Sequence, residues 1–160
     1  MKKIIITLLF LISIFKTFYA YAESEKPSLI ITTINGQKFN LSEKKGKVVL
    51  INFWAKWCGV CLKEMNFLDE LNKELKDKNF EIIGLNTERK RRKEKVAEIA
   101  AKLSYQNAIF AEAEETNFEE PNSLPTIYIV NKEGKIHSIL QEDVKDFSKE
   151  NITKIVKSLM

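Results

Sequence analysis

The chain has 160 residues, with 26 Lys and Arg against 22 Asp and Glu, which gives a formal net charge of +4. Lys2, Lys3 and Lys16 lie in the first 22 residues, so the remaining 138 residues carry 23 basic and 22 acidic side chains. This net charge of +1 gives no argument for a partner that is a nucleic acid or an anionic membrane surface. With two cysteines and one histidine in the whole chain, a monomeric zinc site with about four ligands is excluded.

The first 22 residues are predicted to be a secretory signal peptide. Two lysines precede the apolar run of residues 4–15, and Ala20-Tyr21-Ala22 places small residues at the spacing that a signal peptidase needs. The alternative is an uncleaved membrane anchor, because residues 4–22 approach the ~20 residues that span a bilayer, although Lys16 interrupts them. Both interpretations place the rest of the chain outside the cytoplasm. The segment has no cysteine, so a lipoprotein is not indicated.

Residues 23–28 are expected to form a short polar linker, followed by one domain over residues 29–160. Asn35-Gly36 is a strong hairpin-turn signal between strands at 29–34 and 37–41. The elements predicted after this hairpin are, in chain order, a buried strand at 48–54, a helix at 59–78, a strand at 80–85, a helix at 91–103, an acid-rich loop at 112–120, a strand hairpin at 126–130 and 135–140, and a helix at 147–159. This order predicts an α/β fold: a central mixed β-sheet flanked by helices, with an N-terminal β-hairpin.

The two cysteines lie where the buried strand ends and the long helix begins. Backbone N–H groups and the positive end of the helix dipole stabilise a thiolate on Cys58 at this point. Cys61, three residues further on, lies on the first turn and can close a disulfide with Cys58. A purely structural disulfide across so few residues would restrain little of the unfolded chain. The pattern therefore predicts dithiol–disulfide exchange.

The chain resembles the thioredoxin superfamily, and more narrowly the extracytoplasmic TlpA/ResA-like thiol–disulfide oxidoreductases. The matching stretches are the hairpin at Asn35-Gly36, GKVVLINFWAKWCGVCLKEM at residues 46–65, and SLPTIYIVNKEGKI at residues 123–136. The resemblance implies a thioredoxin-like fold. It implies no cofactor and no metal, because the Cys58–Cys61 disulfide is itself the redox-active group.

The resemblance also implies roles for individual residues. Cys58 would be the attacking thiolate and the more exposed sulfur, and Cys61 would resolve the mixed disulfide. Trp57 would shield the site and contact partners. Pro125 would follow a cis peptide bond opposite the cysteines and, with Leu124, present backbone to an extended substrate; the alternative is an ordinary trans proline at the start of a strand.

Glu64 falls one helical turn after Cys61, where a glutamate lines the active-site cavity in ResA-like proteins and is tied to thiol acid–base behaviour. The alternative is a solvated glutamate on a helix surface. In cytoplasmic thioredoxins the strand position that Asn52 occupies here is a buried aspartate, so Glu64 is the better candidate for a titrating carboxyl. Proline commonly stands in the family at the positions of Val60 and Asn66. The reduction potential therefore cannot be transferred from relatives.

The function implied is that of an exported reductant, in the bacterial periplasm or on the outer face of the cytoplasmic membrane. Its client proteins would have reactive cysteines, such as apocytochrome c or copper-site assembly proteins, and its electron donor would be a membrane thiol reductase. A monomer is expected, with membrane contact only through an uncleaved N-terminal segment. The alternatives are a periplasmic oxidant or general disulfide-exchange enzyme and, in another class, a copper-binding assembly protein that uses Cys58 and Cys61 as ligands.

Two other features are interpreted as structural. The basic run at residues 88–95 is expected to be the solvated face of a helix, not a nucleic-acid site. His137 lies in a predicted strand, and nothing in the sequence places it near the cysteines.

Overall fold

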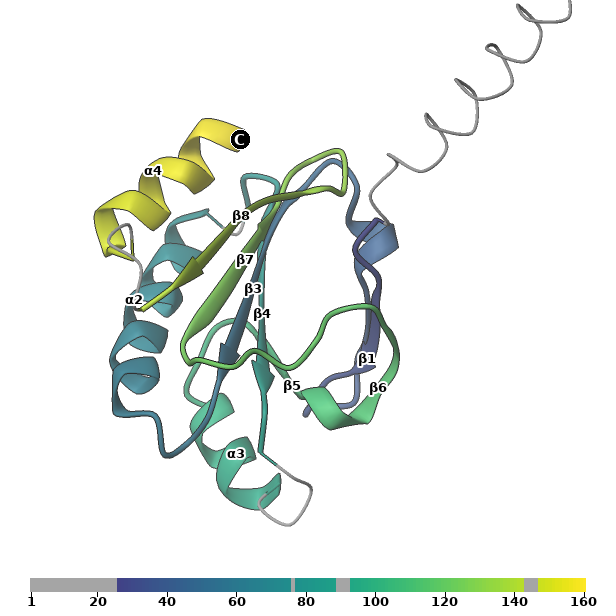
Figure 1. The fold of residues 1–160 in the computed structure, drawn as a ribbon, viewed down its shortest axis with the longest axis vertical. Helices are drawn as coiled ribbons and strands as arrows, with labels where there is room; N and C mark the ends of the chain where they lie inside the picture. The colour runs from purple at the N-terminus through teal and green to yellow at the C-terminus, as the bar shows by residue number, and fades with distance from the viewer. Residues whose placement is uncertain (1–25, 76, 89–92, 143–146) are drawn as a thin grey trace, which may run out of the picture.

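The computed structural model describes residues 26–75, 77–88, 93–142 and 147–160 (Figure 1). The signal-peptide prediction for residues 1–22 and residues 23–25 of the predicted linker lie outside these ranges. The elements along the chain are β1 (Leu29–Thr32), β2 (Lys38–Asn40), the 3-10 helix η1 (Leu41–Lys44), β3 (Val48–Trp54), α2 (Gly59–Leu75), β4 (Phe80–Asn86), α3 (Lys93–Ala100), β5 (Gln106–Ile109), the 3-10 helix η3 (Phe110–Glu112), β6 (Ala113–Thr116), β7 (Thr126–Val130), β8 (Ile136–Gln141) and α4 (Lys149–Leu159).

The predicted central mixed sheet is confirmed. Its strand order is β5-β4-β3-β7-β8, and β3 runs parallel to β4 and antiparallel to β7. All residues of β3 are buried, because six of its seven side chains are apolar and the strand has a neighbour on each side and a packed layer on each face. Asn52 is the one polar residue in it.

The two faces of the sheet are covered by different layers. Val48 and Leu50 point to the face that α2 and α4 cover. Val49 and Ile51, alternating with them along β3, point to the other face, which packs against the smaller sheet. This second sheet has the order β2-β1-β6 and lies beside the central one in Figure 1.

The N-terminal hairpin is confirmed, with Thr32 opposite Lys38 and a turn in which Gly36 has a φ of 82°. The prediction of an acid-rich loop at 112–120 is wrong in part. Its residues 113–116 form β6, which pairs antiparallel with β1, and Glu114 accepts a hydrogen bond from Thr32 at 3.1 Å. The sequence Ala-Glu-Glu-Thr carries no strand signal of its own, and the strand that stabilises it is more than 80 residues away in the chain.

The helices are shorter than predicted: α2 ends at Leu75, α3 covers Lys93–Ala100, and residues 91–92 lie outside the described part. Strand β5, which the sequence did not predict, forms the sheet edge next to β4. No helix within the described residues is long and apolar enough to cross a membrane.

Candidate active site at the start of α2

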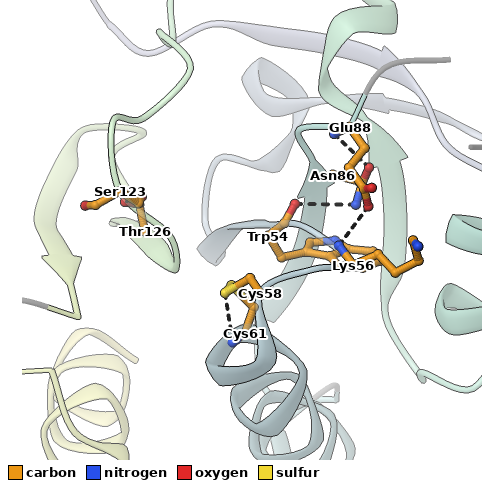
Figure 2. The surroundings of a disulfide bond; sticks show 8 residues. All are labelled: Trp54, Lys56, Cys58, Cys61, Asn86, Glu88, Ser123 and Thr126. Atoms are coloured by element: carbon orange, nitrogen blue, oxygen red, sulfur yellow. Dashed lines mark hydrogen bonds between the residues drawn. A yellow bond between two sulfur atoms is a disulfide. The ribbon is translucent and has the colours of Figure 1, made fainter. Parts of the chain in front are cut away.

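The two cysteines form a disulfide at the junction of β3 and α2, with a sulfur–sulfur distance of 2.00 Å. Cys58 lies just before the first residue of α2 and Cys61 lies on its first turn. The backbone N–H of Cys61 donates a hydrogen bond to Cys58 Sγ at 3.1 Å (Figure 2). Cys58 is 7% exposed and Cys61 is 0% exposed. Cys58 is therefore the more accessible sulfur, as the resemblance implied.

The loop between Trp54 and Cys58 is held by residues at the end of β4 and just beyond it. The side-chain amide of Asn86 donates to the carbonyl of Trp54 at 3.4 Å, and its side-chain oxygen accepts from the N–H of Glu88 at 3.0 Å. The Glu88 carboxylate accepts from the N–H of Lys56 at 2.8 Å (Figure 2). The expectation that the run starting at Glu88 is the solvated face of a helix is wrong for Glu88, which is 8% exposed and precedes α3. Parallel pairing of β3 with β4 brings Asn86 and Glu88 to this loop, so the local sequence did not predict their role.

Behind the loop, the indole N–H of Trp54 donates to the side-chain oxygen of Asn107 at 3.1 Å. Asn107 passes over Gly84 so closely that a Cβ there would lie 2.1 Å from that oxygen. A glycine at position 84 is therefore what allows the asparagine to reach the tryptophan.

Several of the residues expected to contact partners surround the cysteines. Trp57 is 69% exposed, and Val60, between the cysteines, is 41% exposed. Leu124 is half-buried and packs against the cluster that contains both cysteines. The peptide bond between Leu124 and Pro125 is cis, as the resemblance implied. The fold thus brings together two segments more than 60 residues apart in sequence.

Glu64 is buried, so the alternative of a solvated helix glutamate is wrong. It is 7% exposed, and neither carboxylate oxygen has a hydrogen-bond partner within the described residues. Burial, with a smaller contribution from the negative charge of Glu142, raises the pKa of Glu64 from 4.5 to about 8. A carboxyl with this pKa can both accept and release a proton near neutral pH.

His137 is not brought to the cysteines. It is exposed and follows Ile136, which pairs with Val130 at one end of the β7–β8 ladder, whereas Gln141 pairs with Thr126 at the end next to Pro125. Across the ranges that the structure describes, no group of three or more His, Cys, Asp or Glu side chains is placed to hold a metal ion.

This geometry suits exchange between a dithiol and a disulfide. The positive end of the α2 dipole and the N–H of Cys61 both favour a thiolate on Cys58. The Cys58 thiolate can attack a disulfide of another protein and form a mixed disulfide. The neighbouring Cys61 sulfur can then attack Cys58 and release the other protein.

Comparisons with known proteins agree with this chemistry. A model of the Redoxin family matches residues 22–156. The chain is 31% identical over 147 residues to the thiol-disulfide oxidoreductase ResA of Bacillus anthracis, covering 84% of this chain and 81% of that protein. It is 32% identical over 117 residues to the thioredoxin-like protein YneN of Bacillus subtilis (strain 168), covering 72% of this chain and 68% of that protein.

Solved structures show the same fold. A thiol:disulfide interchange protein of the thioredoxin family from Chlorobium tepidum TLS matches with a TM-score of 0.67 at 20% identity, covering 86% of this chain and 99% of that chain. The exposed lipoprotein thioredoxin Etrx1 from Streptococcus pneumoniae strain TIGR4 matches with a TM-score of 0.62 at 22% identity, covering 82% of this chain and 99% of that chain. The chain belongs to the Redoxin family and is a TlpA/ResA-like thiol–disulfide oxidoreductase of the thioredoxin superfamily.

Proposed function

We propose that this oxidoreductase works as a reductant outside the cytoplasm. Its dithiol form reduces disulfides in exported client proteins, and its clients belong to the maturation of cytochrome c or of copper sites. The leader in residues 1–22 supports export. The similarity to thiol-disulfide oxidoreductases named ResA supports thiol–disulfide exchange. The electron donor that returns the protein to its dithiol form is proposed to be a membrane thiol reductase.

The reaction begins with Cys58. Its thiolate attacks one sulfur of the client disulfide, and the other client sulfur leaves as a thiolate that takes a proton from solvent. The thiol of Cys61 then passes its proton to the Glu64 carboxylate and attacks Cys58 Sγ. The second client sulfur leaves as a thiolate, and the Cys58–Cys61 disulfide of this structure is the product. Two electrons have moved from the protein to the client.

The observation that carries the proposal is the burial of Glu64 one turn beyond a fully buried Cys61. A thiol in an apolar interior resists losing its proton, because burial disfavours the thiolate. In the reducing direction, Cys61 must lose that proton while the client is still attached. A carboxyl with a pKa near 8 provides a base of matched strength for this step.

The client surface is proposed to be Trp57 together with Leu124 and Pro125. The indole of Trp57 offers a large exposed aromatic surface next to Cys58, and aromatic side chains dominate protein contacts of this kind. Leu124 packs beside the cysteines and joins the cis bond. The protein is proposed to act as a monomer, with no nucleic-acid partner.

The reduction potential of the Cys58–Cys61 pair tests the direction. The full chain, equilibrated in defined thiol buffers, should give a value near or below the ~−270 mV of thioredoxin. A value near the ~−120 mV of strong periplasmic oxidants would overturn the proposal in favour of an oxidant. Stoichiometric retention of Cu(I) against a competing chelator would instead favour copper delivery. Cys61→Ser, which has no second sulfur, is the matched control for both measurements.

A further inference from the structure

A buried cluster of polar side chains lies on the face of the central sheet that α2 covers. It consists of Asn52 on β3, Glu64 on α2 and Tyr105 just before β5, which are 0%, 7% and 7% exposed. Both side-chain polar atoms of Asn52, both carboxylate oxygens of Glu64 and the hydroxyl of Tyr105 lack hydrogen-bond partners in the ranges that the structure describes. Asn52 and Tyr105 have no role in the exchange described above.

The three side chains are neighbours on one face of the sheet. Asn52 continues the series of Val48 and Leu50, which points to the face covered by α2, and Tyr105 belongs to the same packed cluster as these two residues. The pKa of the Tyr105 hydroxyl is raised by burial and then by the negative charges of Glu64 and Asp69, while the nearby Asn52 amide opposes this shift. The Glu64 carboxylate and the Asn52 amide are therefore both close enough to the Tyr105 hydroxyl to affect its pKa.

A cluster of this composition is suited to an ordered water molecule. Polar groups in protein interiors are almost always satisfied, and internal waters typically make about three hydrogen bonds to such groups. Asn52 and the Tyr105 hydroxyl can each both donate and accept, and so can the Glu64 carboxyl when it is protonated. One water can therefore satisfy a group on each of the three elements.

A cavity beside α3 lies next to one member of this cluster. A cavity of about 440 Å³ is lined by Tyr105, Asn107 and Leu103 together with Ala97 and Ala100 of α3. Of the three cluster members, Tyr105 is the one that also lines the cavity. The small alanine side chains on α3 leave this space open, and Asn107 supplies a polar wall.

We propose that Asn52, Glu64 and Tyr105 hold an internal water, and that Tyr105 is a positioning residue that controls when Glu64 exchanges a proton with Cys61. After Glu64 has accepted the proton of Cys61, it passes a proton to this water, and the proton leaves to solvent through the cavity beside α3. The route lies behind the cysteines, so it stays open while a client covers Trp57. The inference rests on the role proposed above for Glu64.

The test compares Tyr105→Phe with Tyr128→Phe, a matched variant on the opposite face of the sheet. Glu64 is titrated by carboxyl NMR in the oxidised full chain, in which the cysteines do not titrate. The other titratable groups around the cluster are Asp69 on α2 and Glu142 after β8. The Tyr105 hydroxyl, acting through the water, favours the ionised form of the Glu64 carboxyl. Tyr105→Phe should therefore raise the Glu64 midpoint by about 0.5 pH unit or more, whereas Tyr128→Phe should leave it unchanged.

Three outcomes would overturn the inference. The first is a Glu64 midpoint that is the same in Tyr105→Phe as in the unmodified protein, and the second is an equal shift in Tyr128→Phe. The third is the absence of a magnetisation-transfer signal between bound water and the side-chain amide protons of Asn52. Failure of the Glu64 proposal itself is seen separately, as a pH profile of client reduction that Glu64→Gln leaves unchanged.

Discussion

The surroundings of Cys58 differ from those of Cys61, although only two residues separate them. Cys58 lies beneath a rim of exposed apolar side chains, with Trp57 69% and Val60 41% exposed. Cys61 is 0% exposed and is followed one turn later by Glu64, whose carboxyl is buried without a partner in the described residues. The outer side carries the surface proposed to contact clients, whereas the inner side carries the carboxyl proposed to accept the proton of Cys61.

The difference follows from how the helix meets the sheet. Residues three apart on α2 lie on the same side, so Cys61 and Glu64 both face the sheet, while Trp57 and Val60 lie on the loop and the outer surface of the first turn. The proposed client surface and the proposed acid–base group therefore lie on opposite sides of one helix. Substitutions on the two sides should have different signatures.

The largest expected effect separates the two cysteines. Cys58→Ser and Cys61→Ser should each lower turnover of a disulfide-containing client by on the order of 10³-fold or more, because each removes a sulfur that reacts. Only Cys61→Ser should accumulate a mixed disulfide with the client, detected by mass spectrometry under non-reducing conditions. An adduct formed through Cys61 in Cys58→Ser would show that the exposed and buried sulfurs have exchanged roles.

The next effect concerns Glu64 and the pH dependence of stability. Its pKa is about 8 in the folded protein and near 4.5 when unfolded, so between these values the folded state holds a proton that the unfolded state has lost. The stabilisation is complete below pH ~4.5 and is lost as the pH rises through ~8. Relative to Glu64→Gln, the unmodified protein should lose about 1.4 kcal/mol of unfolding free energy per pH unit in this range. Urea unfolding of the oxidised proteins from pH 5 to 8.5 measures this difference.

Glu81 provides the control for this experiment. Burial raises its pKa, but its hydrogen bonds and ion pairs with Lys44 and Lys47 outweigh that effect, and the net pKa is lowered. Its contribution is present above its unfolded pKa and is lost only as the pH falls. Glu81→Gln should therefore leave the slope between pH 5 and 8.5 unchanged. Parallel slopes for Glu64→Gln and the unmodified protein would contradict the protonated state assigned to Glu64.

The smallest expected effect is that of a substitution at Trp57, on the outer side of the cysteine pair. Trp57→Ala should lower kcat/KM for a protein client by about tenfold, because an aromatic contact is lost from the client surface. The unfolding free energy should change by less than ~0.5 kcal/mol, since the side chain is already largely in solvent. Ile136→Ala, at the far end of β8, is the matched control for removing an exposed apolar side chain and should leave kcat/KM unchanged. An equal loss in the control would show that the effect is not specific to the client surface.

Local sequence was sufficient to predict the centre of the protein. A run of seven residues with one polar member predicted β3, and the apolar spacing after Cys61 predicted α2, because burial and amphipathicity are imposed by near neighbours in the chain. The positions of the cysteines at this junction, and the chemistry that follows from a helix N-terminus, needed no knowledge of the rest of the fold.

The second sheet and the edge strand could not be predicted in this way. Strand β6 has the sequence Ala-Glu-Glu-Thr, and it is a strand because it pairs with β1, which is more than 80 residues away in the chain. Strand β5 is four residues long and is stabilised by parallel pairing with β4. A short strand that is stabilised by pairing with a distant segment need not have a periodic hydrophobic pattern in its own sequence.

Sequence alone determined that Cys58 and Cys61 form an exchangeable pair, because a CxxC between a buried strand and a helix is a local arrangement. It left Glu64 with two interpretations, buried or solvated. Only the tertiary structure decided between them, since Glu64 is buried in the folded protein. Its charge interacts with Tyr105 from the segment before β5 and with Glu142 from the segment after β8. The pKa of a carboxyl is set by what surrounds it in space, and those surroundings come from parts of the chain that are far apart in sequence.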